Sequence, residues 1–444
     1  MNRRDFLKNS AMLAAVQALP FTVEAKGRIP DAPVETTGTG KIIDSEPMLQ
    51  NYAEESIGVA FSVTGNANGF VIYGRQPDLK DGKKVYCGGF RVTDMNSDVM
   101  LVRLTGLEPS TTYYYRIGAD SISYVDGYNM KVLATEESQK IYSFRTAGIK
   151  TESHFCVIND THSHWDTMTK LTARIAEIAP SCVVWNGDIC NRLETIDEQK
   201  KVLLKPDMPM QDYASRIPYL FVPGNHDLRG MANRHLERVW MFRQPEERLG
   251  RDWDLGRNFA IRLGDVAMVG LDTGEDKQDT HPAFANLFNS SAYRVAQQAW
   301  LADALNREDI ASAPFLVAFC HIPLFDADPA ANPGDIKPDD TDSRYHYNYA
   351  AWQRTCSQLW TPLLQKAGCQ LVVTAHQHAY RFDKPSEGRS WAQVVGGGPE
   401  GTNASAGDFA TLMDCNVNKG ILHLRVYNIV NGQLVDEHQF APRQ

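Results

Sequence analysis

Residues that can bind a metal or transfer a proton follow five short apolar stretches of this sequence. In the clearest case a Pro-Gly turn ends the apolar run 219–222, and Asn225, His226 and Asp227 come directly after that turn. The other four runs lead into Asp160 and His162, into Asp188, into His321, and into His376 and His378. Ligands of open α/β sheets bind beyond the carboxyl ends of the strands. The sequence therefore predicts that these side chains meet at one edge of a sheet.

The types of these residues favour a site for divalent metals. Carboxylate oxygens and imidazole nitrogens without a thiolate suit manganese, iron or zinc. In an extended segment residues i and i+2 point the same way. Asp160 and His162 can therefore converge on one metal, while His376 and His378 can lie beside two adjacent ones. One such residue alone is usually only a hydrogen-bonded polar group, but five strand ends that all carry them favour a built site.

The region 149–444 must position these side chains, and its alternation of strand and helix patterns predicts a mixed α/β domain. Apolar stripes, together with one first-turn proline and one closing glycine, predict three helices at 167–178, 290–305 and 361–368. Hairpins are predicted near Gly264-Asp265 and at Asn431-Gly432. The irregular stretch 326–348 has the length of a lid or a binding loop.

Residues 47–148 have a different pattern, with short alternating strands between glycine, aspartate and asparagine turns, which predicts an all-β domain. Residues 107–116 resemble the signature that precedes a late strand of fibronectin type III domains, which are immunoglobulin-like sandwiches. In such sandwiches a tyrosine fixes a corner by a hydrogen bond to the main chain, and we assign this role to Tyr113. The tyrosines of this segment are interpreted as sheet packing, and the domain as a support or interaction module.

The motifs Asp-x-His, Gly-Asp, Gly-Asn-His-Asp, a later histidine and His-x-His occur in an order that resembles the calcineurin-like metallophosphoesterases. The resemblance runs from about residue 150 to the end and implies two packed sheets flanked by helices, an α/β/β/α architecture. It also implies a site for two divalent metals. Asp160, His162 and His378 would hold the first metal, Asp188 would bridge, and Asn225, His321 and His376 would hold the second.

In this family a hydroxide that bridges the two metals attacks phosphorus. The resemblance implies that His226 gives a proton to the leaving oxygen as general acid and that Asp227 orients His226. The expected substrate is a small-molecule phosphoester, either a monoester or a diester. A nucleotidase of the same fold stays open, and so does a non-catalytic binding protein that uses the fibronectin-like module.

The arrangement of an all-β domain before the metal domain also resembles the purple acid phosphatases. Those enzymes have glycine where this chain has His162, and a tyrosine ligand where this chain has Asn191. A tyrosinate bond to iron(III) is therefore not expected. Ala375 replaces the glycine that usually precedes the histidine pair, and this change removes no ligand.

The chain has 444 residues and a net charge of −9, which disfavours a protein that wraps nucleic acid. Residues 1–25 resemble a twin-arginine export signal, with Arg3 and Arg4 before a modest apolar stretch. We therefore expect a periplasmic or secreted protein with no membrane span once the signal is removed. Residues 26–46 are predicted to be an extended lead-in. Four of the eight cysteines lie in or beside the apolar runs and are predicted to be core thiols. The oligomeric state is left open by the sequence.

Overall fold

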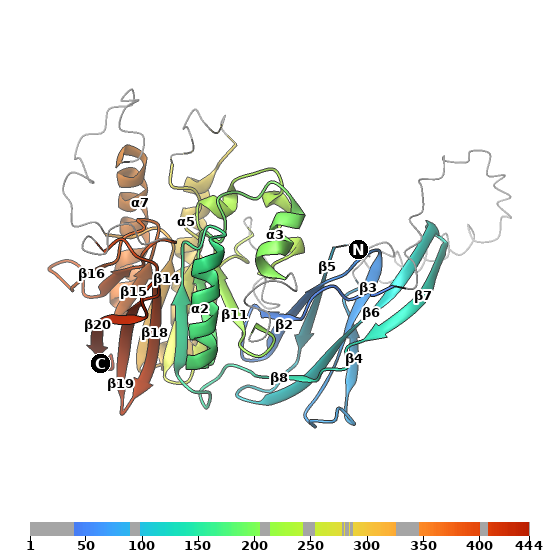
Figure 1. Ribbon diagram of the computed structural model, residues 1–444. Coiled ribbons are helices and arrows are strands. Elements are labelled where there is room, and N and C mark those ends of the chain that lie inside the picture. Colours follow the sequence, from blue (N-terminus) through green and yellow to red (C-terminus); the bar gives the residue numbers. More distant parts are fainter. Residues whose placement is uncertain are drawn as a thin grey trace, which may run out of the picture.

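Figure 1 shows the chain as a computed structural model. The structure describes residues 40–88, 98–204, 214–242, 254–277, 279, 284, 287–325, 346–399 and 407–443, and only the backbone of 346–355. The predicted export signal, most of the predicted lead-in and the loop up to residue 345 lie outside the described residues. Within the part that is described, no helix has both the length and the apolar character needed to cross a membrane.

The first eight strands build the N-terminal region. They are β1 (Met48–Gln50), β2 (Ser56–Ser62), β3 (Ala67–Gly74), β4 (Lys83–Tyr86), β5 (Val99–Thr105), β6 (Thr112–Asp126), β7 (Asn129–Glu137) and β8 (Tyr142–Arg145). One sheet has the order β4-β3-β6-β7, with β8 also paired to β6. The Tyr113 hydroxyl accepts a hydrogen bond of 3.0 Å from the main-chain N–H of Glu108, as expected for a tyrosine that fixes a corner.

The remaining strands belong to two larger sheets. They are β9 (His154–Ile158), β10 (Cys182–Asn186), β11 (Tyr219–Val222), β12 (Phe259–Leu263), β13 (Val266–Leu271), β14 (Phe315–Cys320), β15 (Leu371–Thr374), β16 (Arg381–Asp383), β17 (Ala392–Val395), β18 (Thr411–Asn418), β19 (Ile421–Asn428) and β20 (Gln433–Phe440). The order is β20-β19-β18-β9-β10-β11-β1-β2-β5 in the nine-stranded sheet and β12-β13-β14-β15-β17-β16 in the six-stranded sheet. Both predicted hairpins are confirmed, as β12–β13 and β19–β20.

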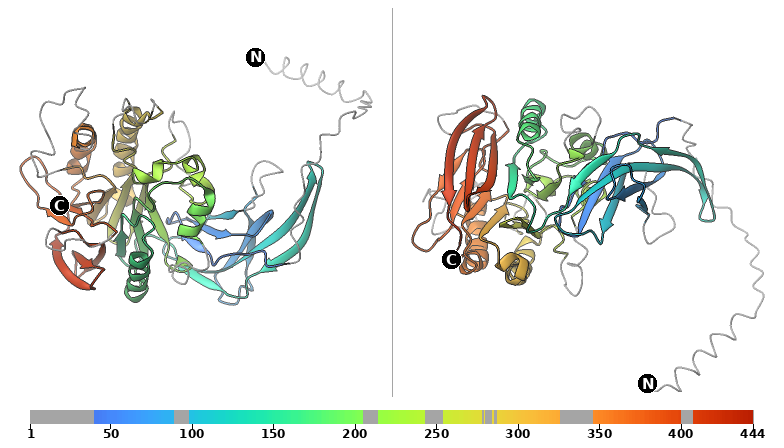
Figure 2. Two further views of the ribbon diagram at one scale, coloured as in Figure 1. Left: turned by 45° about the horizontal axis from the view of Figure 1, so that its top comes forward. Right: turned by 90° about the horizontal axis from the view of Figure 1, so that it is seen from below.

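Helices cover the outer faces of the two sheets. They are α2 (Trp165–Ile178), α3 (Ile196–Leu203), α5 (Ser290–Asn306), α6 (Glu308–Ala311) and α7 (His346–Lys366), with 3₁₀ turns η1 (His226–Leu228) and η2 (Asn233–Arg238). The two views of Figure 2 place α2 on the opposite side of the paired sheets from α5 and α7. The chain therefore has the mixed α/β architecture that the motifs predicted, with two sheets between helical layers.

Buried side chains explain this layering. The facing sides of the sheets share one apolar core that includes Val157 and Val184 from the nine-stranded sheet and Met268, Val317 and Val373 from the six-stranded sheet. Separate clusters lie under α2 and under α5 with α7. Because the central strands are buried on both faces, they appear in the sequence as continuous apolar runs rather than as alternating patterns.

The N-terminal region shares a sheet with the rest of the molecule. β1 pairs with β11 in parallel through Gln50 and Tyr219, so β1, β2 and β5 extend the sheet that carries β9 to β11. The apolar core is also continuous, since Tyr113 and Phe144 belong to the same cluster as Val157. The division of the chain at residue 148 stays a prediction.

One helix prediction was wrong at its start. α7 begins at His346 and runs through Pro362, whereas the proline had been assigned to the first turn of a shorter helix. A proline inside a helix removes one hydrogen bond, but buried Cys356, Trp360 and Leu364 bind α7 to the core on both sides of it. Gly368, with φ +70°, ends the helix as expected.

All eight cysteines lie among the described residues and are free, and seven of them are buried. Cys156, Cys182, Cys320 and Cys369 are at most 3% exposed. The prediction that these four thiols belong to the core is therefore confirmed.

Candidate metal centre

The candidate residues come from the ends of five strands in two sheets. Asp160 and His162 follow β9, Asp188 follows β10, and Asn225 follows β11, all from the nine-stranded sheet. His321 follows β14, and His376 with His378 follows β15, both from the six-stranded sheet. The strands β9, β10 and β11 are parallel to one another, as are β14 and β15. Their carboxyl ends therefore meet along one edge of the packed sheets.

Two groups of potential ligands form at this edge. Asp160, His162, Asp188 and His378 make the first group, and Asp188, His321 and His376 make the second; within each group, ligand atoms lie within 4.8 Å of one another. Asp188 belongs to both groups. Asn225 joins the second group, because its Oδ1 lies 2.9 Å from Nδ1 of His376. The structure thus brings together all seven residues predicted as ligands.

The distances between these atoms fit shared metals. Nε2 of His162 lies 3.0 Å from Nε2 of His378, and Nε2 of His321 lies 3.2 Å from Oδ2 of Asp188. Oδ1 of Asp160 lies 3.4 Å from Nε2 of His378. Two nitrogens that bind one metal at about 2.1 Å lie roughly 3 to 3.4 Å apart, depending on the angle between them.

Atoms without partners point to the same conclusion. Oδ1 of Asp160 and Nε2 of His321 are buried, and within the part of the chain that the structure describes neither makes a hydrogen bond of good geometry, although Nε2 of His321 lies 3.2 Å from Oδ2 of Asp188. Asp160 and Asp188 are at most 1% exposed. Buried polar atoms are normally hydrogen-bonded, and buried charges are normally paired or coordinate metals. The residues present therefore fit a pair of cations.

The backbone is strained at most of these positions. Asp160, His162, Asp188, His376 and His378 all have positive φ, between 43° and 70°. Each such non-glycine residue costs of the order of 1 to 3 kcal/mol and is retained where the surrounding structure requires it, often at functional sites. The sharp turns after β9, β10 and β15 aim these side chains at one point.

Glycines allow the close packing of this edge. A Cβ on Gly187 would lie 2.2 Å from Nδ1 of His321, and one on Gly398 would lie 2.6 Å from Cβ of His378. A Cβ on Gly224 would lie 2.2 Å from Oδ1 of Asp188. The glycines of the Gly-Asp and Gly-Asn-His-Asp motifs are thus explained by the volume that the ligands occupy.

Asp160 is held by its neighbours on one oxygen only. Its Oδ2 accepts hydrogen bonds from Nδ2 of Asn159 at 2.7 Å and from the main-chain N–H of His376 at 3.0 Å. Nδ2 of Asn159 also donates to the Gly397 carbonyl at 2.8 Å. These contacts fix the carboxylate and leave Oδ1 for the histidines.

The charges of the buried groups oppose one another. Burial alone would raise the pKa of Asp188, but His321 and the other imidazoles hold this pKa well below its usual range. Burial alone would lower the pKa of His321, but Asp188 and Asp160 raise it to about 10. Burial and then the charge of His321 lower the pKa of His376 to about 4. Without a metal, the positive charge of protonated His321 is therefore the main balance to the negative charges of Asp160 and Asp188.

The predicted catalytic histidine lies beside the first ligand group. Nδ1 of His226 donates to the Asn191 carbonyl at 2.6 Å, and the ring centroid of His226 lies 4.9 Å from that of His162. The main-chain N–H of His226 donates to Oδ1 of Asp188 at 2.9 Å. His226 is thus placed at the centre without being a member of either ligand group.

The expected contact of Asp227 with the ring of His226 is wrong. The Asp227 carboxylate accepts hydrogen bonds from the main-chain N–H groups of Asp188 at 2.8 Å, Ile189 at 3.1 Å and Gly224 at 2.8 Å. The Asn191 carbonyl orients the imidazole instead. Asp227 lies within the 3₁₀ turn η1, and its buried carboxylate fixes the loop that carries Asp188 rather than the ring of His226.

The sequence prediction missed a pair of acids near the second ligand group. Glu275 and Asp276 are buried after β13, and Oδ2 of Asp276 lies 3.8 Å from Nε2 of His376. Burial raises the pKa of Glu275 to about 7. A signal was present, because these acids follow an apolar strand as the predicted ligands do. The sequence prediction also missed Asn159, which holds the Asp160 carboxylate, because no sequence motif marks this position.

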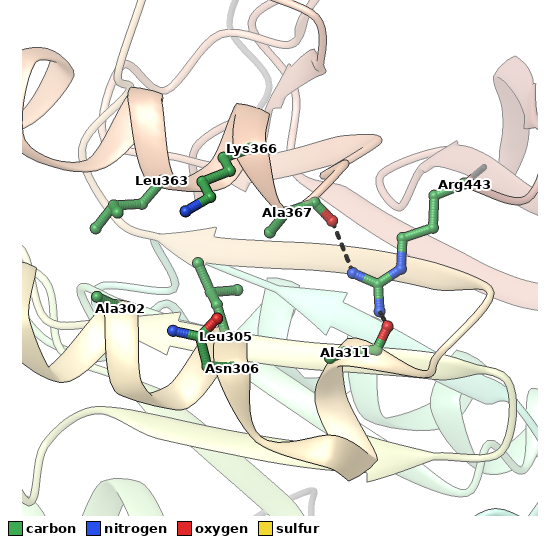
Figure 3. Close-up of a pocket in the computed structure, with 8 residues that line it drawn as sticks. All are labelled: Ala302, Leu305, Asn306, Ala311, Leu363, Lys366, Ala367 and Arg443. Carbon is green, nitrogen blue, oxygen red and sulfur yellow. Dashed lines mark hydrogen bonds between the residues drawn. The ribbon is translucent and has the colours of Figure 1, made fainter.

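A cavity of about 320 Å³ lies away from this centre, between α5, α6 and α7 (Figure 3). The residues that line it lie near the amino ends of β14 and β15, whereas His321 and His376 follow the carboxyl ends of these two strands. The Arg443 guanidinium at this cavity donates to the carbonyls of Ala311 and Ala367, both at 2.8 Å. None of the residues that line this cavity is a candidate metal ligand, so the cavity is separate from the candidate site.

Known protein families and sequences share similarity with this chain. Residues 153–380 match the sequence profile of the calcineurin-like phosphoesterases. The chain is 22% identical over 304 residues to purple acid phosphatase 15 of Arabidopsis thaliana, covering 63% of this chain and 48% of that protein. It is 25% identical over 305 residues to purple acid phosphatase 23 of the same plant, covering 63% and 56%. The matched region spans about half the length of these relatives.

Solved structures share the fold. The purple acid phosphatase PPD1 from yellow lupin (Lupinus luteus) seeds aligns with a TM-score of 0.60 at 15% identity, over 90% of this chain and 74% of that one. PhoD aligns with a TM-score of 0.63 at 12% identity, over 93% and 92%. Each alignment covers at least 90% of this chain, so the likeness in fold extends over most of its length.

Proposed function

Since this chain belongs to the calcineurin-like phosphoesterase family, we propose that it is an exported phosphoesterase that uses two divalent metals. The observation that carries the proposal is the meeting of two ligand groups that share Asp188. The proposed ligands are Asp160, His162 and His378 for the first metal, Asn225, His321 and His376 for the second, and Asp188 for both. Manganese, iron and zinc all suit these nitrogen and oxygen ligands.

The metals would supply Lewis acidity toward the phosphoryl oxygens and lower the pKa of water toward neutrality. The chain's own residues supply position and a proton. The Asn191 carbonyl binds Nδ1–H of His226 and fixes the ring, so the proposed proton donor to the leaving oxygen is Nε2. Such proton transfer typically contributes 10²- to 10⁴-fold to the rate. Asp227 keeps the main chain of Asp188 in place.

Two variants test these roles separately. His226→Ala should keep two metals per chain and lower kcat by about 10²- to 10⁴-fold. Asp188→Ala should lose metal as well as activity, because both ligand groups contain Asp188. Elemental analysis and hydrolysis of an aryl phosphate measure the two properties. Loss of metal from His226→Ala would refute the division of roles.

The proposed substrates are small phosphoesters, and a monoester, a diester and a nucleotide are the candidates. An aryl phosphate, a bis-aryl phosphate and a nucleoside monophosphate, each assayed with and without chelator, distinguish these classes. A protein that holds two metals and hydrolyses none of the three would favour the alternative of a binding protein.

Export through the twin-arginine route to the periplasm or the medium is part of the proposal. It rests on Arg3 and Arg4 and on the apolar stretch that follows them. A double Arg3→Lys, Arg4→Lys variant should accumulate inside the cell, whereas the unchanged chain should leave it. Equal export of both chains would remove this part of the proposal.

A further inference from the structure

An arginine beside the metal centre has no role in the function proposed above. Nε of Arg229 donates to Oε2 of Glu275 at 3.0 Å, and its Nη2 donates to Oε1 of Glu275 at 2.6 Å and to Oδ1 of Asp276 at 2.9 Å. The side chains of Glu275 and Asp276 are 0% and 5% exposed. This two-pronged contact with a buried carboxylate fixes the plane of the guanidinium.

The third guanidinium nitrogen is directed at the proposed proton donor. Nη1 of Arg229 lies 3.3 Å from Nε2 of His226. Nδ1–H of His226 donates to the Asn191 carbonyl, so Nε2 is the ring nitrogen that faces Nη1. Nη1 therefore lies next to the atom at which the leaving oxygen of a substrate is expected.

The acidic residues around the site would repel a phosphate group unless a positively charged side chain lay nearby. The nearby acids Asp160, Asp188 and Asp276 are buried, and the chain as a whole carries a net charge of −9. A phosphate group would enter this acidic surrounding as an anion. The side chain of Arg229 is 23% exposed, so it is buried enough to be held firmly and open enough to meet a ligand.

The other arginines that flank the motifs are placed differently. The side chain of Arg192 is 72% exposed and lies 3.6 Å from the carboxylate of Glu194. Arg381 donates to Asp383, to Gln377 and to the carbonyl of Phe325, which fixes its own loop. Arg229 is the one of these three with a contact to His226.

We propose that Arg229 is a substrate-binding residue of this site. Its Nη1, next to Nε2 of His226, donates to a phosphate oxygen beside the bond that breaks, and Glu275 holds the guanidinium in place for that contact. Donors fixed in advance stabilise developing charge without reorganisation. The inference rests on the proposed function, because it places the phosphate at the same metals.

Inorganic phosphate tests the contact without turnover. The metal-loaded protein is titrated with phosphate by calorimetry, and the metal content of each sample is measured. Arg229→Met should raise the Kd for phosphate by about 10- to 100-fold, as expected for a lost hydrogen bond between charged groups. Glu275→Gln should raise it in the same direction by a smaller factor. Arg174→Met is the matched control, since Arg174 pairs with Glu177 on the surface of α2.

The readouts separate substrate binding from a structural role. Arg229→Lys keeps the charge but cannot form the fork and reach His226 together, so it should recover only part of the affinity. A Kd for Arg229→Met within twofold of wild type would overturn the inference. Loss of metal from both Arg229 variants would also overturn it, because Arg229 would then support the ligands.

Failure of the proposed function gives a different result. A wild-type protein that binds phosphate through Arg229 but hydrolyses no phosphoester removes the proposed function and leaves only the phosphate contact of Arg229. Normal hydrolysis together with an unchanged phosphate Kd in Arg229→Met removes only this inference. A metal-loaded wild-type protein that binds no phosphate overturns it as well.

Discussion

Asn159 offers a test of how the first ligand group is held. Its Nδ2 donates at 2.7 Å to the Asp160 carboxylate and at 2.8 Å to the Gly397 carbonyl. A hydrogen bond to a charged group contributes about 1.5 to 3 kcal/mol and a neutral one about 1, so Asn159→Ala should lose about 2.5 to 4 kcal/mol of stability. The freed Asp160 should also weaken metal binding at the first site by about 10- to 100-fold, the usual effect of removing a residue that orients a ligand.

The assay is a competition titration with a chelator that resolves the two metals, combined with thermal unfolding. Gln50→Ala is the control, because Gln50 is also buried and bonded to the main chain but pairs with the amino end of β11. Both variants should unfold at a lower temperature than wild type, and only Asn159→Ala should lose metal affinity at the first site. Equal metal affinities in the two variants would refute the reasoning that Asn159 positions Asp160.

Three further predictions concern packing, charge and thiols. Gly187→Ala should displace His321, which a Cβ would approach to 2.2 Å, and should lower metal content, whereas Gly420→Ala, with a similar φ but open space, should keep it. The pKa of His321 is raised to about 10 from an unfolded value near 6.5. Its stabilising effect is therefore complete below about pH 6.5 and is lost as the pH rises through 10. Thermal unfolding in chelator should show this loss, and the metal-loaded protein, with a neutral His321, should not; a rise in stability of the chelated protein over this range would contradict the assignment. A thiol reagent should modify no more than one cysteine, Cys87, in the native protein and eight after unfolding, and several fast-reacting native thiols would contradict the buried positions.

The ligand positions could be predicted from the sequence because they depend on local patterns. A buried strand such as β10 appears as an apolar run, and the residue that follows it, such as Asp188, lies at the sheet edge whatever the details of the loops. The same reasoning predicted the edge position of His321 and of His376. Two strand ends in different sheets still had to face each other, and the family resemblance supplied that step.

Contacts between loops could not be predicted in this way. The family resemblance implied that Asp227 orients His226, but the Asp227 carboxylate binds main-chain groups of residues 188 and 189. Glu275 and Arg229 are 46 residues apart in the sequence, and their contact forms only in the folded chain. The start of α7 was missed because the prediction gave Pro362 more weight than the tertiary contacts that carry the helix through it.

The parallel pairing of β1 with β11 makes the first strands an integral part of the molecule. A shortened chain that begins at residue 149 would leave an open, hydrophobic strand border directly before Asn225, and such borders promote aggregation. We therefore expect the shortened chain to be insoluble or metal-poor, and the intact chain to melt in a single calorimetric transition. Removing the first strands would thus destabilise β11 and the metal ligand that follows it, although none of these strands contributes a residue to the candidate metal centre.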